Sequence, residues 1–310
     1  MGSLIDIKSY PVNRVLPILL EDKTTKENII FATDSYIDKG DDYTANSHIT
    51  VGNIAGIDPF DLQPRAAKEQ SDQSARTKKR AEVFTPSWIC NRMNNDCDEE
   101  WFGRRDVFNF ENGKTWEMNP EKVRFPEGTT WQDYVLSRRL EITCGEAPFL
   151  VSRYDTTTGE IILPPERRIG ILDRKLRVVK ENTEDEESWL EWAYKAFQST
   201  YGYEFQGDNL LVGRINLMNT FTDYLDDRWH RLATMAELKK VANIIAWNIW
   251  QMDGLTGTVP FKAKQPKYEA MSLFDFDEPK EEAPKMIGCR IYDWQANKSQ
   301  SYESLKGVGY

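Results

Sequence analysis

The sequence has 310 residues, enough to bury one large core or two smaller ones. Its 40 Lys and Arg against 50 Asp and Glu give a net charge of −10, which argues against a chain whose whole surface grips nucleic acid, because the phosphate backbone attracts clustered Lys and Arg. No apolar run approaches the roughly 20 residues needed to span a bilayer, so we expect no membrane segment.

The cysteines and histidines offer little to a metal ion. They are Cys90, Cys97, Cys144, Cys289, His48 and His230. The cysteines form no CxxC pair, so we expect no zinc site. The chain begins without a basic segment followed by an apolar core, and the sequence therefore predicts no signal peptide. Free thiols in a reducing cytoplasm are the natural interpretation.

The amino-terminal part of the chain is predicted to be helical. Apolar residues recur at helical spacing between Val15 and Leu20, which indicates an opening helical unit over 8–36. Residues 64–80 follow as a charged helix or linker with six Lys and Arg and no apolar periodicity. We expect this segment to be exposed and to contact DNA or an acidic partner, the alternative being a solvated linker.

In the rest of the chain, predicted strands alternate with predicted helices. We first expect a helix that starts at Pro86 and is capped by Thr85, a loop-rich stretch over 94–130 and a short helix over 131–138. A strand ending at Glu141 follows, then helices over 166–181 and 187–198, a strand over 200–205, helices over 208–225 and 235–246, and strands over 247–251 and 288–294. This alternation favours a mostly parallel α/β sheet.

The stretch from Leu140 to Leu150 is the most informative, because an apolar run ends at Glu141 and a turn of small residues follows. In open α/β sheets ligands bind at the carboxyl ends of strands. The stretch resembles motif I of the DNA adenine methyltransferases that use S-adenosylmethionine: an acidic residue, Pro, any residue, Cys, Gly, any residue, Gly, any residue and Phe. Ile142 stands in place of the Pro and Ala147 in place of the second Gly. The alternative is a plain strand–turn–helix joint.

Three further short matches occur in the order of that family. Phe84-Thr85-Pro86 resembles motif X, which closes over the methionine end of the cofactor. Glu204-Phe205 resembles motif II, whose acidic residue accepts hydrogen bonds from the ribose hydroxyls. Asp253 and Leu255 resemble motif III, whose Asp accepts a hydrogen bond from the adenine amine. The alternatives are a helix cap at Thr85, an exposed Glu at a strand end and an Asp-Gly turn.

The resemblance covers about residues 80–255. It implies a Rossmann-like methyltransferase sheet with a helical amino-terminal extension. The expected division is a helical region with a basic linker over 1–80, and a methyltransferase-like α/β domain, incomplete at its carboxy end, over 81–310. The residues implied to bind S-adenosylmethionine are Phe84, Thr85, Pro86, Glu141, Thr143, Cys144, Gly145, Phe149, Glu204, Phe205, Asp253 and Leu255.

One element of the family is missing. Motif IV has Asp, Asn or Ser followed by Pro-Pro and an aromatic residue, and it holds the flipped adenine. The chain's single Pro-Pro, Pro164-Pro165, precedes the motif II match. We therefore expect no catalytic residue and no methyl transfer by the isolated chain. A partner chain would supply motif IV and target recognition in a restriction–modification enzyme. The alternative is a non-catalytic protein on the same scaffold, acting as a decoy or inhibitor of a bacterial defence complex or as a cofactor sensor.

Overall fold

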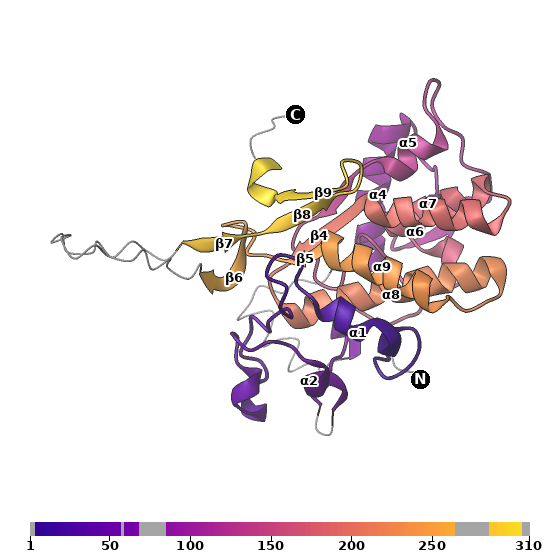
Figure 1. Ribbon diagram of the computed structural model, residues 1–310. Helices are drawn as coiled ribbons and strands as arrows, with labels where there is room; N and C mark the ends of the chain where they lie inside the picture. Colours follow the sequence, from indigo (N-terminus) through magenta and orange to yellow (C-terminus); the bar gives the residue numbers. More distant parts are fainter. Residues whose placement is uncertain (1–3, 57–58, 68–84, 264–284, 306–310) are drawn as a thin grey trace, which may run out of the picture.

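The computed structural model describes residues 4–56, 59–67, 85–263 and 285–305 (Figure 1). The predicted α/β class is confirmed. The centre is a three-stranded sheet of β3 (Arg139–Glu141), β4 (Thr200–Glu204) and β5 (Ile249–Gln251), in the order β3-β4-β5. All three strands run parallel, with Glu141 beside Gly202 and Glu204 beside Gln251. Their carboxyl ends therefore meet at one edge of the sheet.

The other described sheets are two-stranded and antiparallel, so the prediction of a mostly parallel sheet holds for the central sheet alone. These strands are β1 (Asn109–Asn112) with β2 (Thr115–Met118), β6 (Thr258–Ala263) with β7 (Met286–Gly288), and β8 (Arg290–Asp293) with β9 (Lys298–Ser301). The strand predicted over 288–294 is thus divided between β7 and β8.

The helices over the second half of the chain were well predicted. The described α-helices of the whole chain are α1 (Val12–Leu20), α2 (Val51–Ala55), α4 (Ser87–Phe102), α5 (Trp131–Leu136), α6 (Ile171–Asn182), α7 (Glu186–Gln198), α8 (Gly207–Trp229) and α9 (Met235–Asn248). The loop-rich prediction for 94–130 is wrong in its first part, because α4 continues to Phe102. Among the described residues, no helix is long and apolar enough to cross a membrane.

Local side-chain bonds fix where several helices begin. Thr234 and Glu237 form a reciprocal capping box at the start of α9, and Thr130 with Asp133 does the same for α5. The Asp185 side chain accepts a hydrogen bond from the Ser188 amide at the start of α7. Each pair satisfies backbone donors that a helix leaves unpaired in its first turn.

The helix α8 is the centre of the fold. Its side chains are buried on every side from Gly207 to Phe221, which is typical of a helix surrounded by protein. The amino-terminal helix α1 packs against α8 and α9 and shares their apolar core. Arg214 of α8 is fully buried and donates hydrogen bonds to the backbone at the ends of α1 and α9. The amino-terminal region is thereby joined to the sheet.

The two faces of the central sheet are covered differently. Ile249 and the helices form the large core on one face. Tyr203 and Trp250 point to the other face and form a smaller core with Val259, Cys289 and Ile291 of the carboxy-terminal hairpins. Figure 1 shows the helices on one side of β4 and β5 and the hairpins β6–β7 and β8–β9 on another.

Candidate functional site

The turn after β3 is tightly wound and is bonded to the neighbouring strand. Thr143, Gly145 and Ala147 all have left-handed backbone conformations, with φ of 48°, 53° and 64°. The amide of Cys144 donates a 2.8 Å hydrogen bond to the carbonyl of Tyr203 in β4. The helix α8 passes so near that a Cβ on Gly213 would lie 3.0 Å from the Gly145 carbonyl oxygen. Ala147, which stands in place of the second Gly of the resembled motif, has a positive φ, a conformation that favours glycine.

The strand β4 ends at a buried carboxylate that joins this turn. Glu204 is 8% exposed. Its Oε2 accepts a 2.9 Å hydrogen bond from the Gly145 amide, and its Oε1 accepts a 3.1 Å bond from the Gln206 amide. Burial raises the pKa of Glu204, while these backbone donors oppose the rise because they favour the charged form. The structure thus brings together two of the residues predicted to bind the cofactor: Gly145 from the motif I match and Glu204 from the motif II match.

The residues after β5 form the turn that was the alternative interpretation of this segment. The Asp253 Oδ1 accepts hydrogen bonds from the amides of Leu255 and Thr256, at 2.9 and 3.3 Å. The Leu255 side chain is 94% exposed, and the Phe205 ring contacts Phe261 at 5.7 Å between centroids. Both bonds to Asp253 use the same oxygen. Only its Oδ2 is therefore left to accept a ligand's hydrogen bond.

The predicted cap at the start of α4 is wrong. The helix begins at Ser87, and no side chain of its own caps it. Instead the Asp155 Oδ2, from the segment after the turn, accepts a 2.7 Å hydrogen bond from the Ser87 amide. The Thr85 carbonyl accepts a further bond from Thr156 Oγ1 at 3.0 Å. Thr85 and Pro86 therefore lie against the chain that follows the motif I turn. Phe84 and most of the basic segment 64–80 lie outside the described residues, and their roles stay predictions.

A cavity of about 530 Å³ lies at the edge of β3, beside α4. It contains two of the predicted site residues, Glu141 and Phe149. The Glu141 Oε2 is buried and has no hydrogen-bond partner among the described residues. Burial raises the pKa of Glu141 well above its ordinary value. The other lining residues were not predicted: Met93, Asn94, Cys97, Arg138, Arg139, Leu140, Ile142, Leu150 and Ile171. The turn carrying Cys144 and Gly145 and the strand ends at Glu204 and Asp253 do not line this cavity.

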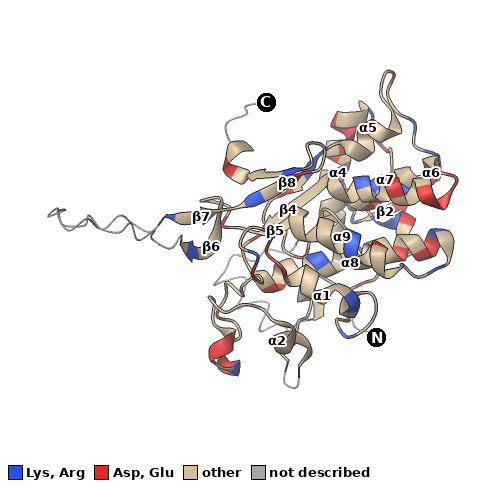
Figure 2. Cartoon of the chain, in the orientation of Figure 1, with Lys and Arg blue, Asp and Glu red and all other residues tan. Residues whose placement is uncertain are grey.

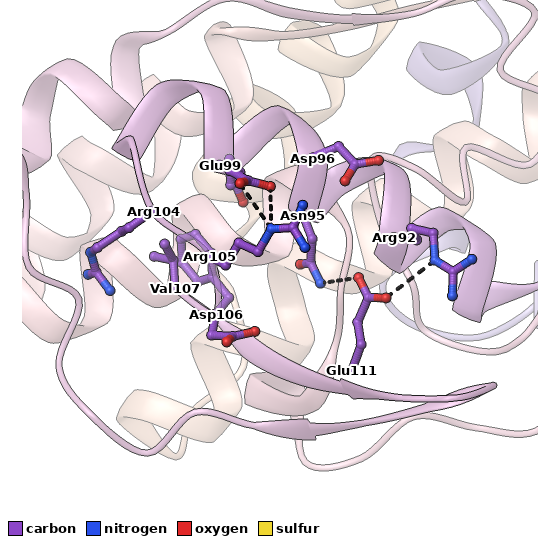
Figure 3. A pocket seen from close by; sticks show the side chains of 11 residues that line it. Arg92, Asn95, Asp96, Glu99, Arg104, Arg105, Asp106, Val107 and Glu111 are labelled. Atoms are coloured by element: carbon purple, nitrogen blue, oxygen red, sulfur yellow. Dashed lines mark hydrogen bonds and ion pairs between the residues drawn. The ribbon is translucent and has the colours of Figure 1, made fainter.

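A second cavity, of about 330 Å³, is lined by charged residues of α4, β1 and the loop between them, and several of these pair with each other (Figure 3). Arg105 Nε donates to both oxygens of Glu99 at 2.9 Å. Glu111 accepts from Arg92 Nε at 3.3 Å and from Asn95 Nδ2 at 2.8 Å. These contacts occupy Arg92, Glu99, Arg105 and Glu111 with neighbouring side chains. Of the predicted site residues that the structure describes, none lines this cavity.

Charge on the described elements is mixed. In Figure 2, Lys and Arg are interspersed with Asp and Glu along the helices and strands, and neither sign gathers over one continuous area in that view. The described part of the chain also holds no group of three His, Cys, Asp or Glu that could bind a metal ion.

The comparisons with known proteins identify no relative. No family model, no curated protein and no solved structure matches the chain. The resemblance to adenine methyltransferases therefore stays a prediction from the sequence.

The left-handed conformation of Thr143 gives a testable prediction. Thr143 is exposed and β-branched, and its φ of 48° disfavours any residue with a Cβ. We expect Thr143→Gly to raise the free energy of unfolding by about 0.5–1 kcal/mol, because relief of roughly 1–2 kcal/mol of strain exceeds the extra entropy that glycine gives the unfolded chain. Urea unfolding measures this. Thr129→Gly, exposed and outside the left-handed region, should destabilise instead, and equal destabilisation by both changes would contradict the prediction.

Proposed function

We propose that this chain is an S-adenosylmethionine-binding, adenine methyltransferase-like protein of a restriction–modification system. The proposed site is the edge where the carboxyl ends of β3, β4 and β5 meet. One observation carries the proposal: the Gly145 amide of the motif I turn lies 2.9 Å from the Glu204 carboxylate at the end of the next strand. A tight turn beside an acidic strand end, in a parallel sheet, is the usual arrangement for a ligand containing a ribose.

The residues at this edge fit an adenosine group. Each oxygen of Glu204 accepts one backbone hydrogen bond in the structure, and an ionised carboxylate can accept about four, so both ribose hydroxyls could donate to it. Asp253 keeps its Oδ2 for the adenine amine. In this proposal Thr85, Pro86 and the turn at Thr143 to Gly145 flank the methionine end. When bound, the cofactor supplies a methyl group on its sulfonium.

Methyl transfer would need a second chain. Pro164-Pro165, the chain's single Pro-Pro, has a structural role: the Pro165 carbonyl accepts a 2.9 Å hydrogen bond from the buried Tyr224 hydroxyl. We expect a partner chain to supply the groups that hold a flipped adenine and recognise the DNA sequence, because base-modifying enzymes need both a polar contact and a stacking surface.

One observation favours the second candidate, a non-catalytic scaffold protein that acts as a decoy, an inhibitor or a sensor. Both Glu204 oxygens are already bonded to the backbone, and Asp253 is bonded to its own turn. A site closed in this way could serve packing rather than binding. Binding of S-adenosylmethionine itself separates a subunit or a sensor from a decoy that never binds it.

The test is titration calorimetry of the full chain with S-adenosylmethionine. We expect binding, with affinity lowered about tenfold or more by Glu204→Gln, because hydrogen bonds to a charged group contribute about 1.5–3 kcal/mol. Glu184→Gln, at an exposed position, is the matched control and should bind like the native chain. Incubation with labelled cofactor and mixed-sequence DNA should transfer no label. Absence of heat and of thermal stabilisation at millimolar cofactor would reject the proposal, and label transfer would show that the chain holds a methyl-transfer site of its own.

A further inference from the structure

The strand β3 is an open edge of the central sheet. Its only sheet partner among the described strands is β4. The amide of Arg139 bonds to the Ser199 carbonyl on the β4 side, and alternate residues of a strand direct their backbone groups to opposite sides. The N–H and C=O of Leu140 therefore point away from β4, toward the edge. Unpaired backbone groups of this kind form a template for another strand.

The side chains at this edge are apolar and uncovered. Leu140 is 48% exposed and lies on the sheet face that carries Tyr203 and Trp250. Ile142, directly after the strand, is 64% exposed. The carboxy-terminal hairpins cover that face at β4 and β5, where Tyr203 and Trp250 are buried, but they leave β3 exposed. Parallel sheets are normally covered on both faces. An uncovered apolar pair on an open edge is therefore the kind of surface that another chain buries.

The other face of β3 carries one basic and one acidic side chain, each with a buried polar atom. Arg139 Nη2 and Glu141 Oε2 are buried, and neither has a hydrogen-bond partner among the described residues. Both residues line the 530 Å³ cavity beside α4. Buried polar atoms in native proteins are nearly always paired, so these two atoms are exceptions among the described residues.

We propose that two copies of this chain pair through β3 in antiparallel orientation, with Leu140 on the two-fold axis. In this register Leu140 exchanges both backbone hydrogen bonds with Leu140 of the second copy, because its N–H and C=O face the edge. Arg139 lies opposite Glu141 of the other copy, and Glu141 lies opposite its Arg139. The pairing is thus self-complementary in charge, as a two-fold interface requires. It joins the two central sheets into one continuous sheet.

The geometry also indicates how strong the contact should be. The paired strand is only three residues long, so residues around it must supply most of the buried interface area. Ile142 and the half-exposed Met93 of α4 lie next to the strand around the cavity. An interface of this size belongs to the class below about 1,200 Å², and a dissociation constant in the micromolar range is expected.

The first test is sedimentation velocity of the full chain between about 1 and 200 µM, the range over which a small interface should dissociate. We expect a reversible monomer–dimer equilibrium. Leu140→Lys, at the exposed axis position, places two ammonium groups against each other and should weaken the dimer at least tenfold. A chain that stays monomeric over the whole range, or a Leu140→Lys variant that dimerises as the native chain does, would overturn the proposal.

A charge-exchange experiment tests the register. Arg139→Glu places Glu opposite Glu141 of the second copy, and Glu141→Arg places Arg opposite Arg139, so each variant alone should be monomeric. Mixed together, the two variants face each other with opposite charges at both positions and should form a heterodimer. The double exchange in one chain should dimerise again. Arg124→Glu, whose side chain is 82% exposed, is the control and should leave the dimer unchanged. Circular dichroism establishes that each variant is folded, and folded single variants that form no heterodimer would disprove this register.

Discussion

Replacing Arg214 by methionine is expected to lower the free energy of unfolding by about 3–5 kcal/mol, because buried acceptors lose a charged donor. The guanidinium is fully buried and donates to the carbonyls of Leu19, Glu21, Ala246 and Ile249, at 2.6 to 3.3 Å. Methionine fills much of the volume but donates to none of these carbonyls. They belong to the end of α1 and the residue after it, to the end of α9 and to β5, so the change should loosen the joint between the amino-terminal region and the sheet.

Equilibrium unfolding in urea measures this loss. Arg124→Met is the control, because the Arg124 side chain is 82% exposed and should change stability by less than about 0.5 kcal/mol. Arg214→Lys keeps the charge and one donor group and should fall between the native chain and the methionine variant. A loss below about 1 kcal/mol for Arg214→Met would mean that water or a shifted backbone satisfies the carbonyls.

Replacing Asp98 by alanine should have an effect of similar size. Asp98 Oδ2 lies 2.5 Å from Arg174 Nη1, and the two side chains are 2% and 1% exposed. Its Oδ1 accepts a 3.0 Å hydrogen bond from the buried Tyr134 hydroxyl. Removing one partner of a buried ion pair costs about 3–5 kcal/mol, because the other charge stays buried without compensation. We expect Asp98→Ala to lower the free energy of unfolding by that amount.

A double-mutant cycle gives the sharper measurement. Arg174→Met combined with Asp98→Ala removes both charges, so the double variant should be less destabilised than the sum of the two single changes. Glu99→Ala is a control on the same helix. Glu99 pairs with the exposed Arg105, so this change should cost less than about 1 kcal/mol. Additive single changes would show that Asp98 and Arg174 are not coupled.

Much of the second half of the fold could be predicted from sequence, because its apolar periodicity is strong. The strand predicted over 200–205 and the helices α7, α8 and α9 occur close to their predicted positions. The helix α4 could not be predicted beyond its start. Its buried face carries Asn91, Asn94 and Asp98, which resemble the residues of a polar loop. Asn91 and Asp98 are buried against Arg174, 76 residues from Asp98 in the sequence, and Asn94 is buried against the carbonyls of Phe149 and Ile169.

The candidate site, too, could be predicted only in part. The proximity of Gly145 to Glu204 follows from two strand ends that the sequence identifies, provided the strands are neighbours. The cavity beside β3 could not be predicted, because Asn94 and Cys97 belong to the part of α4 that was expected to be a loop. Nor does the sequence distinguish an acidic residue that is bonded, such as Glu204, from one whose buried oxygen lacks a partner, such as Glu141.

The distribution of the four cysteines has a practical consequence. Cys90, Cys144 and Cys289 are buried, and burial raises the pKa of each of these thiols. Cys97 is exposed and stands in the wall of the cavity beside β3. Since the thiolate is the reactive form, a maleimide dye added to the native chain should attach at this one position. The unmodified sequence thus carries its own attachment point for a fluorescent reporter. This point lies beside β3, the strand through which two copies are proposed to pair.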